Sequence, residues 1–408
     1  MWSKISGLPP AVKQYLVITG NYWGFTLTDG ALRMLVVLYF HQLGYAPLAI
    51  AMLFLFYEFF GVVTNLVGGW LGARIGLNKT MNIGLVMQVG ALLMLTVPVE
   101  YLTVFWVMLA QAISGIAKDL NKMSAKSGVK TLVPEDMSGK LFRWVALLTG
   151  SKNALKGLGF FLGALLLALL GFRGALLLMA LLLSLVALFS IRVLTGEIGK
   201  AKSKPKFRQI FSKSAALNYL SAARLCLFAA RDVWFVVALP VYLASQLGWH
   251  HEYIGAFMAV WIIAYGLVQV YTPKITGNSK GKSPGANLVS LWGLLLAGIT
   301  LLLVAALYYL QDTGTVLVTG LIVFGVVFAV NSSLHSYLIL ALSSQDEVSM
   351  DVGFYYMANA LGRLLGTVLS GYLFQAYGLL LCLAAASFLA LLAALFIRKV
   401  KPHQAKTA

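Results

Sequence analysis

Apolar runs long enough to cross a bilayer follow one another along almost the whole of this sequence. A membrane-spanning helix needs about 20 mostly apolar residues, and Gly, Pro and charged residues separate windows of that length throughout the chain. Hydrophobic residues fill 60% of the 408 positions and charged residues only 11%. No soluble core could bury so many apolar side chains. The sequence therefore predicts an all-α integral membrane protein and excludes soluble enzymes and nucleic-acid-binding proteins.

The breaks between the apolar windows predict about twelve transmembrane helices. They are expected at residues 13–41, 47–73, 80–98, 101–123, 139–170, 172–194, 214–247, 251–273, 285–310, 313–343, 350–377 and 378–398. An even number of spans places both termini on one side of the membrane, where the tails and loops are rich in Lys and Arg. The opposite side offers Arg173 alone. Because basic residues concentrate in cytoplasmic loops, both termini are expected in the cytoplasm. The expected location is the bacterial inner (plasma) membrane.

The longest polar interruption, GKAKSKPKFRQIFSK, covers residues 199–213 near the middle of the chain. It predicts a basic cytoplasmic linker between an N-terminal six-helix bundle (1–198) and a C-terminal six-helix bundle (214–408). A shift of half the chain length places residues 42–45 (QLGY) on residues 246–249 (QLGW), and Gly174 on Gly378. These matches indicate an internal duplication. Two six-helix halves around a basic loop are the layout of major facilitator transporters.

The segment GWLGARIGLNK, residues 69–79, resembles the cytoplasmic loop signature of major facilitator transporters. The resemblance implies a gating role for its glycines and basic residues, namely Gly69, Arg74, Gly76 and Lys79. The usual acidic position of the signature is Ala73, so the gating salt bridge of the family loses one partner here. A tight basic turn between two spans, without a gating role, would explain the same residues.

The predicted helices contain more cations than anions. A charged side chain at the centre of a membrane costs at least about 2.5 kcal/mol, so each one needs a partner, a wet cavity or an ionic ligand. The cations are Arg33, Lys118, Arg143, Lys152, Lys156, Arg224, Arg231 and Arg363, and the anions are Asp29, Glu58, Asp119 and Asp232. Even with every carboxylate paired, positive charge remains inside the membrane. An anionic substrate would neutralise it.

Helical spacing in the first half groups the candidate residues. Asn21, Asp29 and Arg33 share one stripe, and Asp29 and Arg33 can either pair with each other or face one cavity. Lys152 and Lys156 lie one turn apart, deep in a long helix whose glycines allow a close neighbour. Arg143 is expected near the cytoplasmic rim. Lys118, near a helix end, can also reach water along its own stem.

In the second half, Arg231 lies two turns after Arg224, with Asp232 beside it and Pro240 as a potential kink. The other candidates recur at four-residue spacing: Asn331 with His335, and then Tyr355 or Tyr356 with Asn359 and Arg363. A buried histidine such as His335 is more often a packed core residue than a ligand contact. The convergence of Arg, Asn and Tyr is what favours a binding site.

A multiply charged oxyanion suits these residues best. The planar guanidinium of Arg binds oxyanion oxygens in pairs, whereas Lys provides a point charge. Multidrug and sugar sites need no such cationic excess. No metal ion or cofactor is expected, and Cys226 and Cys382 are predicted to be buried thiols. The expected partners are the substrate and membrane lipids, with the protein as a monomer.

Four segments that contain many of these charges resemble ArsJ-type organoarsenical efflux permeases, and the likeness spans nearly the whole chain. They are residues 20–34, 114–126, 150–157 and 230–235. The resemblance implies export of 1-arseno-3-phosphoglycerate, which forms when glyceraldehyde-3-phosphate dehydrogenase uses arsenate in place of phosphate, and hence arsenate resistance by alternating access. Its two oxyanion groups would fit two basic clusters, which we expect to be Lys118, Lys152 and Lys156, and Arg231 with Arg363.

Three carboxylates are candidates for proton coupling or charge pairing. Asp29 and Asp232 each have an arginine close by in sequence, whereas Glu58 has none, which makes Glu58 the first choice for coupling. A structural role for Glu58, exchange against phosphate, and facilitated exit are alternatives. An organophosphate/phosphate antiporter would need the same cations. A membrane-embedded lipid-phosphate enzyme is less favoured, because motifs such as HExxH and GxSxG are absent.

Overall fold

A computed structural model describes residues 10–45, 50, 53–132, 138–194, 200, 214–277, 284–343 and 348–400. Helices make up nearly all of this part, and it contains no β-strand, which confirms the all-α prediction. The elements are α2 (Pro10–Gln42), α4 (Leu55–Ile75), α5 (Leu77–Met94), the short 3-10 helix η1 (Val99–Tyr101), α6 (Val104–Leu132), α7 (Ser138–Val193), α8 (Ala215–Phe235), α9 (Ala238–Ser245), α10 (His251–Ile275), α11 (Ala286–Tyr309), α12 (Thr313–Leu342) and α13 (Val348–Arg398). The predicted linker at 199–213, apart from residue 200, and the predicted start of a helix at residue 47 lie outside the described residues.

Six stretches of the described chain are long and apolar enough to cross a membrane. Two of them, within α7 and α13, are 53 and 51 residues long. Because a bilayer core is about 30 Å thick and a helix rises 1.5 Å per residue, each of these two stretches is long enough for two spans. Each is broken near its middle by a glycine outside the helical conformation, Gly171 in α7 and Gly378 in α13. The breaks confirm the predicted boundaries at residues 170–172 and 377–378.

Turn glycines support part of the predicted duplication. Gly44 and Gly248, which the half-length shift superposes, both have a positive φ, at 83° and 65°. Only glycine adopts this conformation readily, so the two turns are alike in geometry as well as in sequence. The break in α7 lies at Gly171, three residues before the Gly174 that the shift superposes on Gly378, so the two breaks are not at matched positions.

Two predicted helices differ from those observed. The predicted helix 214–247 is divided into α8 and α9, with the break just before Pro240. Pro240 has no N–H to donate to the carbonyl four residues earlier, and its ring clashes with that carbonyl. At the break, the Ala238 N–H donates to Ser370 Oγ at 3.1 Å. The helix predicted to end at residue 123 continues as α6 to Leu132, so Lys126 and Lys130 lie on a helix rather than in a loop.

The described chain forms two compact units. The first unit takes residues from Met1–Met137, Ser151–Phe211 and Ser344–Met357, and the second takes residues from Ser138–Gly150, Ser212–Ser343 and Ala358–Ala408. The unit boundaries therefore cut through the long helices α7 and α13. The division into six-helix halves around residues 199–213 stays a prediction.

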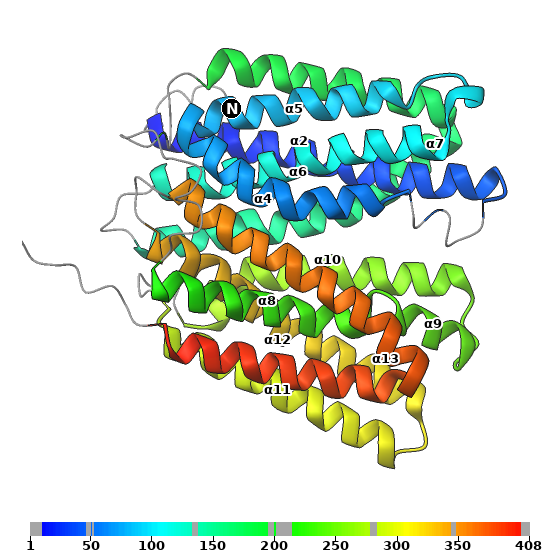
Figure 1. The fold of residues 1–408 in the computed structure, drawn as a ribbon, viewed down its shortest axis with the longest axis vertical. Coiled ribbons are helices and arrows are strands. Elements are labelled where there is room, and N and C mark those ends of the chain that lie inside the picture. The colour runs from blue at the N-terminus through cyan, green and yellow to red at the C-terminus, as the bar shows by residue number, and fades with distance from the viewer. Residues whose placement is uncertain are drawn as a thin grey trace, which may run out of the picture. The chain divides into compact units, whose positions relative to one another are not determined.

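In the first unit, α6 packs against α2, α4 and α5 (Figure 1). In the second unit, α12 packs against α8, α10 and α11. The core of the second unit is aromatic, since the Trp234 ring meets Trp261 and Phe324 edge to face at 6.1 and 5.0 Å. Each unit thus has a central helix, and the polar residues of the candidate site lie on these central helices or directly beside them.

Candidate functional site

Close contact between α4 and α6 organises the charged cluster of the first unit. A Cβ atom at Gly115 would lie 2.7 Å from the carbonyl oxygen of Tyr57, and one at Gly61 would lie 3.1 Å from Asp119 Oδ2. Only glycine leaves room for this approach. It brings Tyr57 on α4 next to the lysines of α6.

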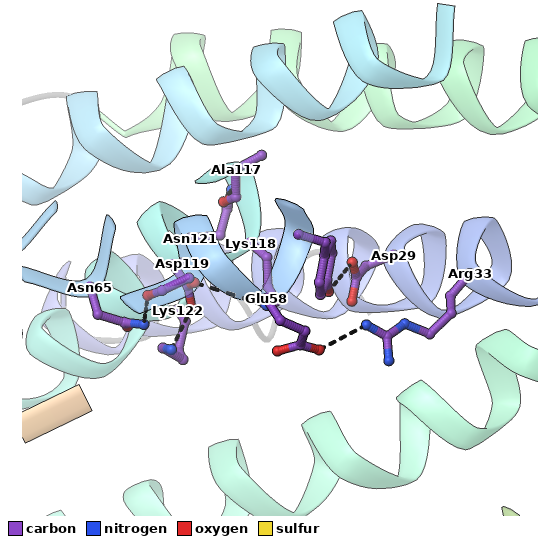
Figure 2. Close-up of polar contacts among 11 residues, drawn as sticks. Asp29, Arg33, Glu58, Asn65, Ala117, Lys118, Asp119, Asn121 and Lys122 are labelled. Atoms are coloured by element: carbon purple, nitrogen blue, oxygen red, sulfur yellow. Dashed lines mark hydrogen bonds and ion pairs between the residues drawn. The ribbon is translucent and has the colours of Figure 1, made fainter. Parts of the chain in front are cut away.

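Asp119 is the carboxylate at the centre of this cluster. Its side chain is 1% exposed, with Lys122 Nζ at 2.5 Å and Lys118 Nζ at 3.9 Å (Figure 2). The ring of Tyr356, from α13, lies below the ammonium groups of Lys122 and Lys126, at 4.8 and 5.6 Å. Lysines at four-residue intervals on α6 therefore form a row beside one buried carboxylate.

Asp29 and Arg33 do not pair with each other, although they lie one turn apart on α2. Asp29 Oδ1 accepts a hydrogen bond from the Tyr57 hydroxyl at 2.7 Å. Arg33 Nη2 instead meets Glu58 Oε1 at 3.0 Å (Figure 2). Glu58, which has no arginine near it in sequence, therefore has one from another helix in space. Its choice as the coupling carboxylate stays a prediction.

Lys152 and Lys156 are half-buried on α7, as expected for residues deep in a long helix. Lys152 Nζ donates to Asn153 Oδ1 at 3.3 Å, and Lys156 Nζ lies 5.8 Å from the centre of the Phe160 ring. The predicted close neighbour is α2, because a Cβ at Gly159 would lie 2.7 Å from the carbonyl oxygen of Leu27. The predicted grouping of these two lysines with Lys118 in one cluster stays a prediction.

Asn21 contacts residues of two neighbouring helices. Its amide nitrogen donates to Ser190 Oγ at 2.8 Å and contacts Met81 Sδ at 3.6 Å, which ties α2 to α7 and α5. The structure therefore gives Asn21 a role in helix packing. The three residues of the predicted stripe, Asn21, Asp29 and Arg33, each contact a different partner.

In the second unit, Asp232 holds two arginines. Its carboxylate is 1% exposed, with Arg231 Nη2 at 2.6 Å and Arg363 Nε at 3.3 Å. Arg363 comes from α13, which approaches α8 through Gly366, where a Cβ would lie 2.9 Å from both the Ala229 carbonyl oxygen and Asp232 Cβ. Arg231 and Arg363, which were predicted to form one basic cluster, therefore both contact the carboxylate of Asp232.

Arg224 is a buried cation that was not among the predicted binding residues. Its Nε donates to Asn359 Oδ1 at 2.8 Å, and its Nη1 donates to the carbonyl oxygen of Ser332 at 3.1 Å. The Phe228 ring contacts both arginine groups of α8, with Arg224 Cζ at 4.0 Å and Arg231 Cζ at 4.9 Å. Arg224 thus binds Asn359, which was predicted to be a ligand contact, and continues the row that leads to Arg231.

The other predicted residues of the second half are buried. No hydrogen-bond partner of Asn331, or of His335 Nδ1, is found in the described part of the chain. Asn331 Nδ2 lies 3.4 Å from the Cβ position of Gly293 on α11, so its amide faces that helix. Tyr355 is fully buried on α13, where its ring meets that of Tyr356 edge to face at 5.0 Å.

The predicted gating segment joins α4 and α5. Gly76, with φ 93°, breaks the chain between the two helices, while Arg74 and Lys79 are exposed. Gly69 lies against α13, where the Ser349 hydroxyl donates to its carbonyl oxygen at 2.7 Å. A gating role for these residues stays a prediction. At Gly69 a side chain would disturb the contact with α13.

Replacing Gly69 with alanine is expected to lower the thermal unfolding temperature. The new Cβ would lie 2.6 Å from the Ser349 carbonyl oxygen and 2.9 Å from Gly353 Cα, so α4 and α13 must separate. Overpacking of this kind costs about 1–3 kcal/mol. Gly90→Ala on α5 is the matched control, because no heavy atom of the described residues lies within 4 Å of its Cβ position. Equal unfolding temperatures of the two variants would contradict the close α4–α13 contact.

The contacts of the two clusters also involve residues that were not predicted to belong to a binding site, namely Tyr57, Phe228, Ser332 and Lys122. The spacing of Lys118, Lys122 and Lys126 could have shown the lysine row if α6 had been extended. Within the described residues, no group of three or more His, Cys, Asp or Glu side chains could hold a metal ion.

Comparison with known proteins identifies the family. The family model described as Major Facilitator Superfamily matches residues 16–286 and 220–408. No curated protein matches the chain. Solved structures similar to it include the human organic anion transporter MFSD10 (18% identity, TM-score 0.75, covering 96% of this chain and 100% of that one). Others are the E. coli fucose:proton symporter (12%, 0.75, 96% and 100%) and a bacterial homologue of the iron transporter ferroportin (16%, 0.72, 94% and 99%).

At these identities the solved structures show the fold alone, whereas the family model covers most of the chain. The chain therefore belongs to the Major Facilitator Superfamily and is an integral membrane transporter.

Proposed function

We propose that this transporter exports a small organic oxyanion, and that 1-arseno-3-phosphoglycerate is its substrate. The observation that carries the proposal is that two buried carboxylates are each shared by two cations. In the described residues, Asp119 is shared by Lys118 and Lys122, and Asp232 is shared by Arg231 and Arg363. Each cluster therefore has one positive charge more than its shared carboxylate neutralises. An anionic group of a substrate would balance this charge.

The geometry of the clusters supports oxyanions over other anions. Guanidinium groups bind the oxygens of phosphate, arsenate or carboxylate in pairs, and the second cluster contains two of them. The first cluster offers ammonium groups instead, which tolerate more varied oxygen positions. A substrate with a phosphate ester and a second oxyanion group supplies ligands for both kinds of cation. The resemblance of segments 20–34, 114–126, 150–157 and 230–235 to ArsJ-type permeases supports the arsenical in particular.

Binding of oxyanions to the purified transporter is the direct test. Thermal unfolding is measured with 3-phosphoglycerate, inorganic phosphate and arsenate, with glycerol as a neutral control. A ligand at 100 times its Kd stabilises the folded protein by about 2.7 kcal/mol. We expect 3-phosphoglycerate to raise the unfolding temperature most and glycerol to leave it unchanged. No shift with any oxyanion would refute the proposal.

Single variants locate the binding groups. Arg231→Ala and Lys118→Ala each remove one cation of a cluster and are expected to reduce the affinity for 3-phosphoglycerate at least about tenfold, since charge-assisted hydrogen bonds contribute about 1.5–3 kcal/mol each. Arg143→Ala is the control, because Arg143 is exposed on α7. Unchanged affinity in both cluster variants would show that the oxyanion binds elsewhere.

The rival function is exchange of organophosphate against phosphate, which would use the same cations. Cells that lack the gene should become sensitive to arsenate, and the gene should restore resistance only when glyceraldehyde-3-phosphate dehydrogenase is present. Uptake of glycerol 3-phosphate into phosphate-loaded vesicles would favour the rival. We place the protein in the inner membrane with both termini in the cytoplasm, because Lys and Arg are concentrated in the tails and loops on that side. The expectation of a monomer stays a prediction.

A further inference from the structure

We infer that Tyr57 is a positioning residue that holds the Asp29 carboxylate away from Arg33 and Lys118, and so preserves the positive charge of the first cluster for an oxyanion. This inference rests on the proposed function, because it assigns a role in anion binding at the same site. Neither the spacing of charges in the sequence nor the family points to this tyrosine.

Tyr57 contacts three charged groups at once. Its hydroxyl donates to Asp29 Oδ1 at 2.7 Å. The centre of its ring lies 3.8 Å from Lys118 Nζ and 4.8 Å from Arg33 Cζ. The side chain is almost fully buried, which strengthens both the hydrogen bond and the attraction between the ring and the two cations. One side chain therefore separates one anion from two cations.

The backbone keeps the Tyr57 ring in this place. The Tyr57 carbonyl and Cα lie against Gly115 on α6, where a Cβ would approach them to 2.7 and 3.0 Å. Lys118 is three residues further along the same helix, so its distance from the ring is set by this contact. Glu58, the next residue after Tyr57, pairs with Arg33. The α4–α6 contact thus positions the ring, and the hydroxyl positions Asp29.

Without the hydroxyl, Asp29 has nearby cations to bind. Arg33 lies four residues later on the same helix, a spacing at which carboxylate and guanidinium groups pair readily. A buried carboxylate that loses its hydrogen bond is strongly driven to find another partner. Pairing with Lys118 would neutralise one cation of the cluster, and pairing with Arg33 would add a second carboxylate beside a cation that Glu58 already neutralises. The affinity for an oxyanion would then fall, even though no cation had been removed.

The test is a cycle of variants with inorganic phosphate and 3-phosphoglycerate as probes, measured by calorimetric titration of the purified full chain. Tyr57→Phe keeps the ring and removes the hydroxyl, and we expect the Kd to rise at least about fivefold. Asp29→Asn removes the carboxylate charge and is expected to bind the probes as tightly as the wild type or more tightly. The double variant is expected to recover the wild-type affinity, because an amide cannot neutralise a cation. Tyr39→Phe, the same change on a tyrosine of α2 that stacks on Phe172, is the control.

The outcomes separate this inference from the proposed function. If Tyr57→Phe binds the probes like the wild type, the inference fails while oxyanion binding stands. If Tyr57→Phe weakens binding and Asp29→Asn does not rescue it, the hydroxyl has a purely structural role and the inference fails. If Asp29→Asn alone weakens binding, the carboxylate is itself required, which also overturns it. If the wild type binds neither probe, both the inference and the proposed function fall.

Discussion

Replacing Asp232 with alanine is expected to destabilise the transporter strongly when no oxyanion is present. In the wild type, the buried Asp232 carboxylate lies 2.6 Å from Arg231 Nη2 and 3.3 Å from Arg363 Nε. The variant lacks this shared partner of the two arginines. Removal of one partner from a buried ion pair costs about 3–5 kcal/mol, and partial exposure of the Arg363 side chain reduces this to the lower end of the range. Thermal unfolding of the purified variant measures the loss.

A phosphate ester is expected to restore part of the stability of Asp232→Ala. The two guanidinium groups remain close together, so 3-phosphoglycerate can replace the carboxylate as their anion and should raise the unfolding temperature more in the variant than in the wild type. The double variant Asp232→Ala Arg363→Ala removes one cation together with the anion and should be more stable than the single variant. If the oxyanion does not rescue Asp232→Ala, or if the double variant is less stable still, Asp232 acts through packing rather than through charge.

Much of the fold could be predicted from the sequence, because membrane spans depend on local properties. Length and hydrophobicity of a window decide whether it crosses a bilayer, and these predicted the breaks at Gly171 and Gly378. The break before Pro240 was anticipated as a kink but not as an interruption. The length of α6 was underestimated because Lys126 and Lys130 were taken as loop residues, although a lysine on a helix can bury its stem and reach a partner.

The candidate site was only partly predictable, since charges could be counted but their partners could not. Arg33 and Glu58 are 25 residues apart and meet only because α2 and α4 pack together with a particular rotation. Spacing along one helix allowed Asp29 either to pair with Arg33 or to face a shared cavity, and in the structure Asp29 accepts a hydrogen bond from Tyr57 instead. Arg231 and Arg363 were assigned to one basic cluster, and in the structure both contact Asp232.

Aromatic residues were the main omission. In an apolar window, a tyrosine or phenylalanine gives no signal that distinguishes a ring against lipid from a ring against a cation. Tyr57, Phe228 and Tyr356 each contact two cations, and Figure 2 shows how close the charged groups of α2, α4 and α6 lie in the first unit. A ring beside two cations attracts both without neutralising either. The clusters therefore keep their positive charge, as anion binding requires.

Replacing Gly366 with leucine is expected to weaken oxyanion binding by the second cluster without removing a charge. A Cβ at this position would lie 2.9 Å from the Ala229 carbonyl oxygen and from Asp232 Cβ, so α13 must move away from α8. Arg363, less than one turn earlier on α13, would then lose its 3.3 Å contact with Asp232. We expect the affinity for 3-phosphoglycerate to fall by at least about tenfold, and the stability to fall by about 1–3 kcal/mol from overpacking.

Gly371→Leu on the same helix is the matched control, because no described heavy atom lies within 4 Å of its Cβ position. Both variants add the same apolar side chain to α13, so the comparison isolates the contact with α8. Calorimetric titration and thermal unfolding of the two proteins measure affinity and stability separately. If Gly366→Leu is destabilised but binds 3-phosphoglycerate as tightly as Gly371→Leu, then the Arg363–Asp232 geometry does not contribute to the site. Binding would in that case depend on Arg231 and the other cations alone.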